Sequence, residues 1–196
     1  MLKKSEYLHK KYKRIKRYLR FRLGVQQLIF KPYLNSLFVA VLVGFILFWK
    51  EKSDLYSHTP KLILPIWRSM VHILGISVFL FIFVFIVYMI GELTARRDEG
   101  DLIIAFNEKD LQNGCPILMK KIQDKKTEVT IREFYSNTPL KRWLESKNEI
   151  EDSMNVHFVT PHIEYGGKNR DNGKRILLYT AKGRKRTERG MLYDRE

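Results

Sequence analysis

The sequence predicts a membrane protein in which a two-helix transmembrane hairpin is followed by a small cytoplasmic α+β domain. A stretch of 23 residues, Ser69 to Gly91, contains no charge, and a second uncharged window of 18 residues runs from Pro32 to Trp49. A 23-residue helix is about 34 Å long, and a hydrocarbon core is about 30 Å thick. Soluble helices rarely stay apolar on every face for six turns, so we assign residues 69–91 to a transmembrane helix.

The first window, residues 32–49, is close to the lower length limit for a membrane span. Pro32 suits the first turn of a helix, while Tyr33 and Trp49 suit the two membrane interfaces. Ala40 and Gly44 are small residues four positions apart, a spacing that lets two helices approach closely and that is also common by chance. We therefore predict a second transmembrane helix here.

Residues 1–31 are predicted to form a basic amphipathic juxtamembrane helix. Its apolar residues follow a helical spacing of four, three, four and four: Leu8, Tyr12, Ile15, Leu19 and Leu23. The cations around them are Lys10, Lys11, Lys13, Arg14, Lys16, Arg17, Arg20 and Arg22. We expect these cations to contact the anionic surface of the membrane. Contact with a nucleic-acid phosphate backbone is the alternative.

The charge distribution predicts the orientation in the membrane. Residues 1–31 hold 11 Lys and Arg against one acid, whereas residues 32–91 hold four against two. Arg96 and Arg97 follow the second span. By the positive-inside rule, we expect a multi-pass protein of the cell membrane with both termini in the cytoplasm and residues 50–68 as a short external loop. Pro60 and Pro65 disfavour a continuous helix in that loop.

Residues 92–180 are predicted to form the cytoplasmic α+β module, and residues 181–196 a basic tail. A short apolar run predicts a strand at 102–106, and a strand pair is expected from 116–122 and 128–134. In the second of these strands the apolar residues Val129, Ile131 and Phe134 approximate a period of two, with Thr130 and Arg132 as the alternating polar residues. A helix should start with Thr138 as its cap and Pro139 in its first position, and end near Asn155. Further strands are predicted at 156–159, 162–165 and 175–180. The predicted helix should turn these residues inward: Leu140, Trp143, Leu144, Ile150 and Met154.

Motifs of catalysis and metal binding are missing from this sequence. No phosphate-loop pattern occurs, because Lys174 is followed by Arg175 and the spaced glycine is lacking. His157 and His162 lie five positions apart, and the single cysteine, Cys115, has no partner at metal-ligand spacing. We therefore predict no catalytic residue, no cofactor and no metal, and we do not expect this chain to be an enzyme.

A second basic segment precedes and enters the tail. Nine cations between residues 168 and 189 face two acids, Asp171 and Glu188. The cations are Lys168, Arg170, Lys174, Arg175, Lys182, Arg184, Lys185, Arg186 and Arg189. They are candidates for contact with a DNA or RNA backbone, and a solvated tail is the alternative.

The order of the parts resembles the amino-terminal portion of FtsK/SpoIIIE-type DNA translocases. The similarity is greatest to the coupling proteins of Gram-positive conjugative elements, and it covers about residues 30 to 196. It rests on residues 132–183, which read REFYSNTPLKRWLESKNEIEDSMNVHFVTPHIEYGGKNRDNGKRILLYTAKG. In that family such a module precedes a hexameric P-loop motor that pumps DNA through a membrane pore. The motor's phosphate-binding lysine and its metal-binding acid have no counterpart in these residues, so no catalytic residue carries over.

The resemblance implies a membrane-anchoring and assembly region of a DNA translocase or conjugative coupling machine. Its partners would be the cytoplasmic membrane, further copies of this chain or a P-loop motor in a separate or missing segment, and DNA. The alternative is a membrane adaptor of a secretion or cell-envelope assembly without nucleic-acid contact.

Overall fold

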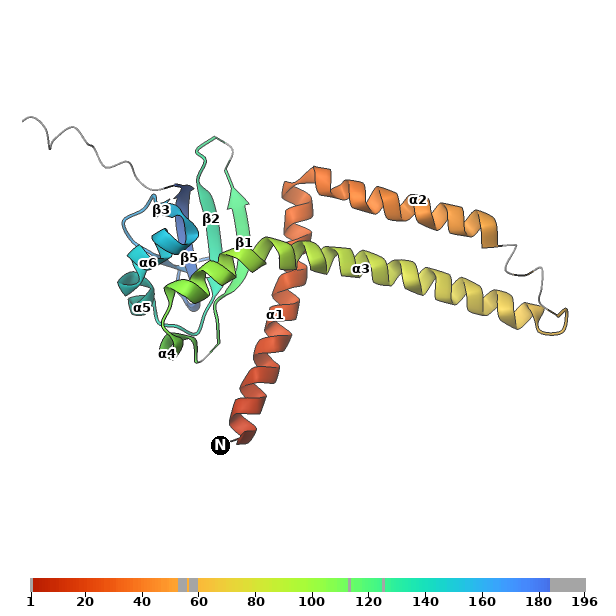
Figure 1. The fold of residues 1–196 in the computed structure, drawn as a ribbon, viewed down its shortest axis with the longest axis horizontal. Helices are drawn as coiled ribbons and strands as arrows, with labels where there is room; N and C mark the ends of the chain where they lie inside the picture. The colour runs from red at the N-terminus through yellow and green to blue at the C-terminus, as the bar shows by residue number, and fades with distance from the viewer. Residues whose placement is uncertain (1, 53–55, 57–59, 113, 125, 184–196) are drawn as a thin grey trace, which may run out of the picture. The chain divides into compact units, whose positions relative to one another are not determined.

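The computed structural model describes residues 2–52, 56, 60–112, 114–124 and 126–183 (Figure 1). The chain divides into two compact units. One is Arg20–Leu93, and the other combines Met1–Leu19 with Thr94–Glu196. Two long helices, α1 (Leu2–Phe30) and α3 (Leu64–Ala105), contribute residues to both units.

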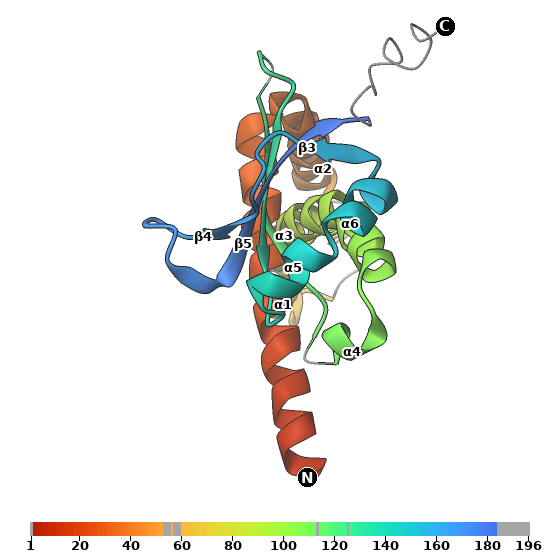
Figure 2. The ribbon, with the colours of Figure 1, turned by 90° about the vertical axis from the view of Figure 1, so that its left-hand side faces the viewer.

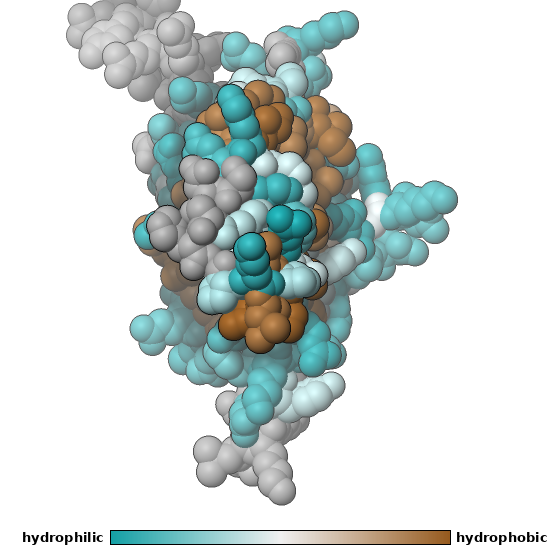
Figure 3. All heavy atoms as spheres, turned by 90° about the vertical axis from the view of Figure 1, so that its right-hand side faces the viewer, coloured by the Kyte–Doolittle hydropathy of each residue, from teal (hydrophilic) through white to brown (hydrophobic). Residues whose placement is uncertain are grey.

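The unit of residues 20–93 contains two helices that are long and apolar enough to cross a membrane. A short 3-10 helix, η1 (Pro32–Asn35), leads into α2 (Ser36–Glu51), and α2 and α3 run side by side (Figure 1). Of the most apolar window in each helix, 0% is buried for Pro32–Glu51 and 17% for Leu64–Ala105. The core helix of a soluble protein would be mostly buried. The structure thus confirms two candidate spans. Figure 3 shows hydrophobic surface at the end of these helices beside hydrophilic side chains.

Aromatic side chains join α2 to α3 within this unit. The rings of Phe38 and Phe83 stack with their centroids 5.0 Å apart, and Phe45 meets Phe79 edge-on at 4.6 Å. Contacts of this kind contribute about 0.5–1.5 kcal/mol each beyond the area they bury. Gly44 does not take part, since a Cβ atom there would meet nothing within 4 Å.

Helices α1 and α3 cross at two glycines in the same unit. A Cβ atom built at Gly24 would lie 1.9 Å from the carbonyl oxygen of Val87, and one at Gly91 would lie 1.9 Å from that of Arg20. The Arg20 side chain is 0% exposed, and its Nε donates to Glu92 at 2.7 Å. This corrects the prediction that Arg20 contacts the membrane surface, because a side chain enclosed by protein cannot reach lipid headgroups.

The other unit is built on a five-stranded antiparallel sheet with the order β1-β2-β5-β3, in which β4 also pairs with β5. The strands are β1 (Ile117–Gln123), β2 (Thr130–Tyr135), β3 (Val156–Phe158), β4 (Glu164–Gly166) and β5 (Asn172–Lys182). The β1–β2 hairpin and the three later strands are confirmed, with β5 longer than predicted at both ends.

One face of the sheet forms the main core with the helices that follow β2. Ile176 and Leu178 of β5 and Phe134 of β2 are fully buried. The Trp143 ring lies between two aromatic neighbours, 4.9 Å from Phe106 and 5.8 Å from Phe134 between centroids. Helices α5 and α6 lie on this side of the strands (Figure 2).

The amino-terminal part of α1 packs on the sheet instead of presenting its apolar stripe to lipid. Leu19 is buried with Ile117 and Met119 of β1. Tyr12, Ile15 and Tyr135 pack against that cluster as half-buried side chains. The predicted amphipathic helix is therefore present, but Tyr12, Ile15 and Leu19 of its stripe have a protein partner within this unit.

Helix α3 continues through the segment predicted as a strand at 102–106. Ala95, Asp98 and Leu102 are buried at spacings of three and four, the period of a helix lying on a sheet. A five-residue apolar run cannot by itself distinguish a strand from a helix, and its residues 102–105 form the end of α3. A short helix, α4 (Glu108–Leu111), follows. At its other end α3 starts at Leu64, before Pro65, which the first helical turn tolerates.

The predicted helix before Asn155 is interrupted. It forms α5 (Leu140–Glu145) and α6 (Lys147–Met154), separated by Ser146 with φ −88° and ψ 18°. The end at Asn155 is confirmed. Asn155 adopts the left-handed conformation with φ 49°, which closes a helix and which asparagine tolerates better than most residues.

The start of α5 differs from the prediction. Pro139 occupies the N-cap position, and the Thr138 hydroxyl donates to the Asp110 carbonyl oxygen at 3.2 Å instead of capping the helix. Trp143 is fully buried as predicted, but Leu144 is 42% exposed. Consecutive residues of a helix point about 100° apart, so a helix with Trp143 against the core turns Leu144 toward solvent.

Candidate functional site

The turn between β4 and β5, together with the start of β5, holds three of the predicted nucleic-acid contacts. Lys168 and Arg170 are exposed in the turn, and Lys174 is exposed near the start of β5. Arg170 forms an ion pair with Glu164, its Nη1 lying 2.9 Å from the carboxylate. Among the described residues no ion pair holds Lys168 or Lys174, so these two side chains remain available to an anion.

Arg175 and Lys182 are the other two predicted contacts on β5. Arg175 is half-buried, with its Nη1 3.5 Å from Glu133. Lys182 is eight residues beyond Lys174 on β5, a distance of about 26 Å at 3.3 Å per residue. The structure thus divides the described part of the basic segment into exposed cations at the β4–β5 turn and the start of β5, a paired Arg175, and a separate position at the far end of β5.

The remaining predicted contacts lie in the tail. Arg184, Lys185, Arg186 and Arg189 are outside the residues that the structure describes. Their contact with nucleic acid stays a prediction.

The predicted membrane-surface cations mostly stand exposed on α1. Those exposed are Lys10, Lys11, Lys13, Arg14, Arg17 and Arg22. Lys16 is half-buried, and its Nζ lies 3.9 Å from the Glu99 carboxylate. Six of the eight predicted contacts can therefore reach an external partner without rearrangement.

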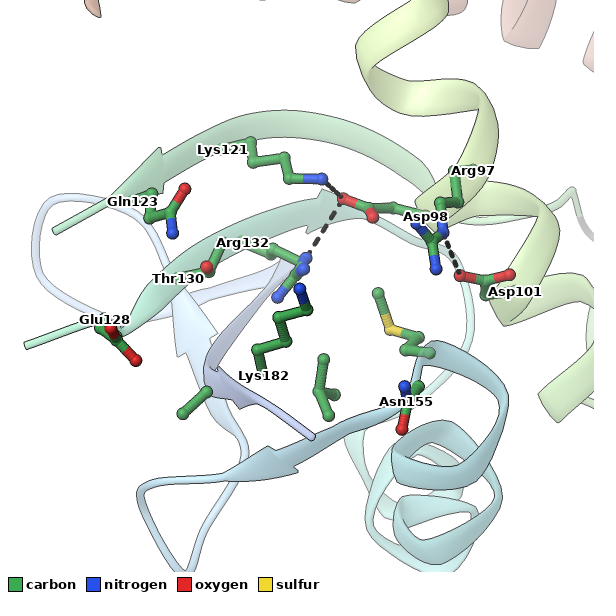
Figure 4. Close-up of a pocket in the computed structure, with 13 residues that line it drawn as sticks. Arg97, Asp98, Asp101, Lys121, Gln123, Glu128, Thr130, Arg132, Asn155 and Lys182 are labelled. Carbon is green, nitrogen blue, oxygen red and sulfur yellow. Dashed lines mark hydrogen bonds and ion pairs between the residues drawn. The ribbon is translucent and has the colours of Figure 1, made fainter. Parts of the chain in front are cut away.

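A polar cavity of about 450 Å³ lies between the carboxyl end of α3 and the sheet (Figure 4). Its walls come from α3, from β1 and β2, from the start of β3 and from the end of β5. The charged side chains in its lining are Arg97, Asp98, Asp101, Lys121, Glu128, Arg132 and Lys182. Four cations thus face three acids, and the near balance of charge disfavours binding of a polyphosphate.

Asp98 is the centre of the charge cluster in this cavity. Its Oδ2 lies 2.7 Å from Lys121 Nζ and accepts from Arg132 Nε at 3.1 Å (Figure 4). Arg132 Nη1 also donates to the Thr180 hydroxyl, which donates to the Thr130 carbonyl oxygen at 3.2 Å. A buried charge is tolerated when it is paired and hydrogen-bonded, so these contacts fasten α3 to β1, β2 and β5.

Two further acids on α3 face the sheet in different ways. Glu99 is buried, and its Oε1 accepts from the backbone N–H of Leu118 at 2.8 Å. Burial raises the pKa of the Asp101 carboxyl, while the Arg97 guanidinium, the next largest influence, acts in the opposite direction. Asp98 and Glu99 therefore hold the structure together, whereas the charge of Asp101 is disfavoured by its surroundings.

Sequence patterns missed this cluster. The alternation over residues 128–134 predicts Arg132 among the polar positions of the second strand, but the buried side chains of β2 are Arg132 and Phe134. Residues two apart share a face of a strand, so the inward face of β2 contains an arginine. One signal in the sequence could have indicated a buried charge, because Asp98 lies between apolar positions of a helical pattern. Its partner Arg132 is 34 positions away, so a local pattern could not identify the pair.

No catalytic arrangement is visible in the part of the chain that the structure describes. It contains no group of three or more His, Cys, Asp or Glu side chains that could hold a metal ion. His157 Nδ1 is hydrogen-bonded to the Gly183 carbonyl oxygen at 2.7 Å, and Cys115 is half-buried with a carbonyl that accepts from the Tyr12 hydroxyl at 2.8 Å. These side chains serve local structure, and the candidate functional surfaces are the basic ones.

Comparisons with known proteins give little. No protein-family model matches the chain, and no curated protein matches it. Among solved structures, the monomer form of the pCW3 conjugation coupling protein TcpA with ATPγS matches with a TM-score of 0.36 and 21% identity. The match covers 44% of this chain and 23% of that chain. A likeness of this size carries no argument about function.

Proposed function

We propose that this chain is a non-catalytic membrane-anchoring and assembly component of a DNA-transfer machine of the FtsK/SpoIIIE type. The anchoring role rests on the exposed apolar surface of α2 and α3. Exposure of two span-length apolar helices to water is energetically unfavourable, whereas a bilayer would cover them. The link to DNA transfer rests on the resemblance of residues 132–183 to the module that precedes such motors.

In this proposal the two parts of the chain have different tasks. The hairpin of α2 and α3 holds the protein in the cytoplasmic membrane, and further copies of the chain assemble beside it. The sheet module docks on a P-loop motor encoded separately or in another segment. The sequence contains no phosphate loop, which supports a non-catalytic role for this chain. The motor would supply the ATP hydrolysis.

DNA contact would come from exposed cations. Lys168 in the β4–β5 turn and Lys174 near the start of β5 are suited to phosphate contacts, because they are exposed and have no ion pair among the described residues. Arg184, Lys185 and Arg186 of the tail are the second candidate group. Neutralising phosphates releases counterions, so such binding must weaken as salt rises.

The test is duplex DNA binding by the full chain in nanodiscs of neutral lipid, followed by fluorescence anisotropy across a salt series. Wild-type affinity should fall steeply with salt. Lys168→Glu with Lys174→Glu should reduce the slope of log K against log salt by about two, since each lost phosphate contact removes about 0.9. The matched control is Lys126→Glu with Lys141→Glu, two exposed lysines elsewhere on the module, which should leave the slope unchanged.

A triple change, Arg184, Lys185 and Arg186 to Glu, tests the tail in the same assay. If neither the turn nor the tail variant alters affinity, or if wild-type affinity is independent of salt, a phosphate contact by this chain is wrong. The protein would then fit the second candidate function, a membrane adaptor of secretion or envelope assembly. That function would be favoured further if deletion of the gene left the transfer of a marked mobile element unchanged in a mating assay.

A further inference from the structure

Residues 7–18 of α1 have an inner side that is already occupied. Tyr12 and Ile15 pack against the cluster of Leu19, Ile117 and Met119, and Leu19 is 3% exposed. The Tyr12 hydroxyl donates to the Cys115 carbonyl oxygen at 2.8 Å, which fixes the rotation of the helix about its axis. These residues therefore cannot insert into a bilayer while the module stays folded.

The outer α1 face is defined here as Tyr7, Lys10, Lys11, Arg14, Arg17 and Tyr18. At 100° per residue these six side chains fall within an arc of about 120°, on the other side of the helix from Tyr12 and Leu19. All six are exposed, Tyr7 to 63% and Tyr18 to 65%. Glu6, the only acidic residue before Glu51 in the sequence, pairs with Lys10 at 2.7 Å. The outer α1 face is thus strongly positive and carries two uncovered tyrosines.

We propose that the outer α1 face docks on anionic phospholipid headgroups of the membrane that anchors the chain. Its cations complement the charge of such a surface, and tyrosine is enriched where bilayer meets water, because its ring is apolar and its hydroxyl is polar. The contact is electrostatic and shallow, since the apolar stripe needed for deeper insertion is packed on β1.

Chain continuity favours lipid over other polyanions. Helix α1 ends at Phe30 and is joined through η1 to α2, a candidate span. Tyr18 precedes Ser36, the first residue of α2, by only 18 positions. A surface linked this closely to a membrane helix meets headgroups at high effective concentration, whereas DNA must be recruited from solution. The inference rests on the proposed membrane anchoring and adds which face of α1 meets the lipid.

The experiment places a fluorophore on the full chain in proteoliposomes. Cys115→Ser removes the native thiol, and single cysteines at Tyr7, Tyr18 or His9 are labelled with NBD. His9 is exposed but points away from the outer α1 face. Vesicles contain a headgroup-located nitroxide lipid as quencher in phosphatidylcholine, with or without about a third phosphatidylglycerol. We expect labels at positions 7 and 18 to be quenched at least twofold more in the anionic vesicles, and the label at 9 to be unaffected.

Salt and charge variants test the physical cause. At about 1 M salt the Debye length falls to about 3 Å, and the extra quenching should disappear. Replacing Lys10, Lys11, Arg14 and Arg17 by Gln should abolish it as well. The matched control replaces four exposed cations elsewhere on the module, Lys109, Lys126, Lys141 and Arg142, by Gln and should keep the extra quenching.

Three results would overturn the proposal. One is equal quenching in neutral and anionic vesicles, and a second is extra quenching that survives in the variant lacking the four α1 cations. The third is protection of positions 7 and 18 from an aqueous quencher by duplex DNA but not by anionic lipid, which assigns the face to nucleic acid. A carbonate wash distinguishes a failure of this inference from a failure of the proposed membrane anchoring. If the protein stays in the vesicles but shows no lipid-dependent quenching, only this inference is wrong. If the protein washes out, the anchoring role is wrong.

Discussion

Asp98 shows how a single buried charge can organise a small domain. Its side chain is 4% exposed and is shared between Lys121 and Arg132, which come from adjacent strands. Removing one partner of a buried ion pair is costly, because the remaining charges lose their compensation without regaining water. The three side chains therefore act as one structural unit.

At this scale we predict that Asp98→Asn lowers the free energy of unfolding by about 3–5 kcal/mol, because Lys121 and Arg132 are left facing one another without a carboxylate. Near-UV circular dichroism of the full chain in detergent during urea unfolding measures the loss. A change below about 1 kcal/mol would show that the cluster contributes little.

Asp101→Asn in the same cavity is the matched control. Burial raises the pKa of the Asp101 carboxyl, so the contribution of this group to stability is present below its ordinary pKa and is lost as the pH rises through the raised value. The folded surroundings therefore disfavour the charged carboxylate relative to the same group in the unfolded chain. We therefore expect Asp101→Asn to cause no loss of stability at pH 7.

At the scale of whole elements, the crossing of α1 and α3 depends on two missing side chains. Gly24 and Gly91 allow each helix to approach the backbone of the other, close to the ion pair of Arg20 and Glu92. Glycine ordinarily weakens a helix by about 0.5–1 kcal/mol relative to alanine. Its presence at both contact points is explained by the close approach.

We predict that Gly24→Ala and Gly91→Ala each destabilise the chain by about 1–3 kcal/mol, because the new methyl group overlaps a carbonyl oxygen of the facing helix. Thermal unfolding in detergent measures the effect. Gly44→Ala and Gly100→Ala are matched controls, since nothing lies within 4 Å of a Cβ atom at either position. These should be neutral or up to about 1 kcal/mol more stable, and equal losses in all four variants would contradict the crossing.

For the molecule as a whole, the distribution of Lys and Arg predicts that both termini are cytoplasmic. A membrane-impermeant maleimide on intact cells tests this. Lys61→Cys in a Cys115→Ser background should be labelled from outside, because residue 61 belongs to the predicted external loop. Native Cys115, which is half-buried, should react only after the cells are opened. Labelling of Cys115 in intact cells would reverse the predicted topology.

Local patterns were sufficient for part of this molecule. The two uncharged windows, the β1–β2 hairpin and the helix end at Asn155 follow from length, alternation and the conformational preferences of single residues. These signals work because each depends on neighbours along the chain.

Other features depended on partners that local patterns do not contain. Residues 102–105 of the predicted strand form the end of α3, and Arg132 points into the core because Asp98 neutralises it. The apolar residues Tyr12, Ile15 and Leu19 of α1 pack on β1 instead of lipid. Length and composition were enough to predict two helices that could cross a membrane and a module of strands and helices. Which charges and which helix faces are enclosed became visible in the folded chain, because burial depends on residues that are distant in sequence and adjacent in space.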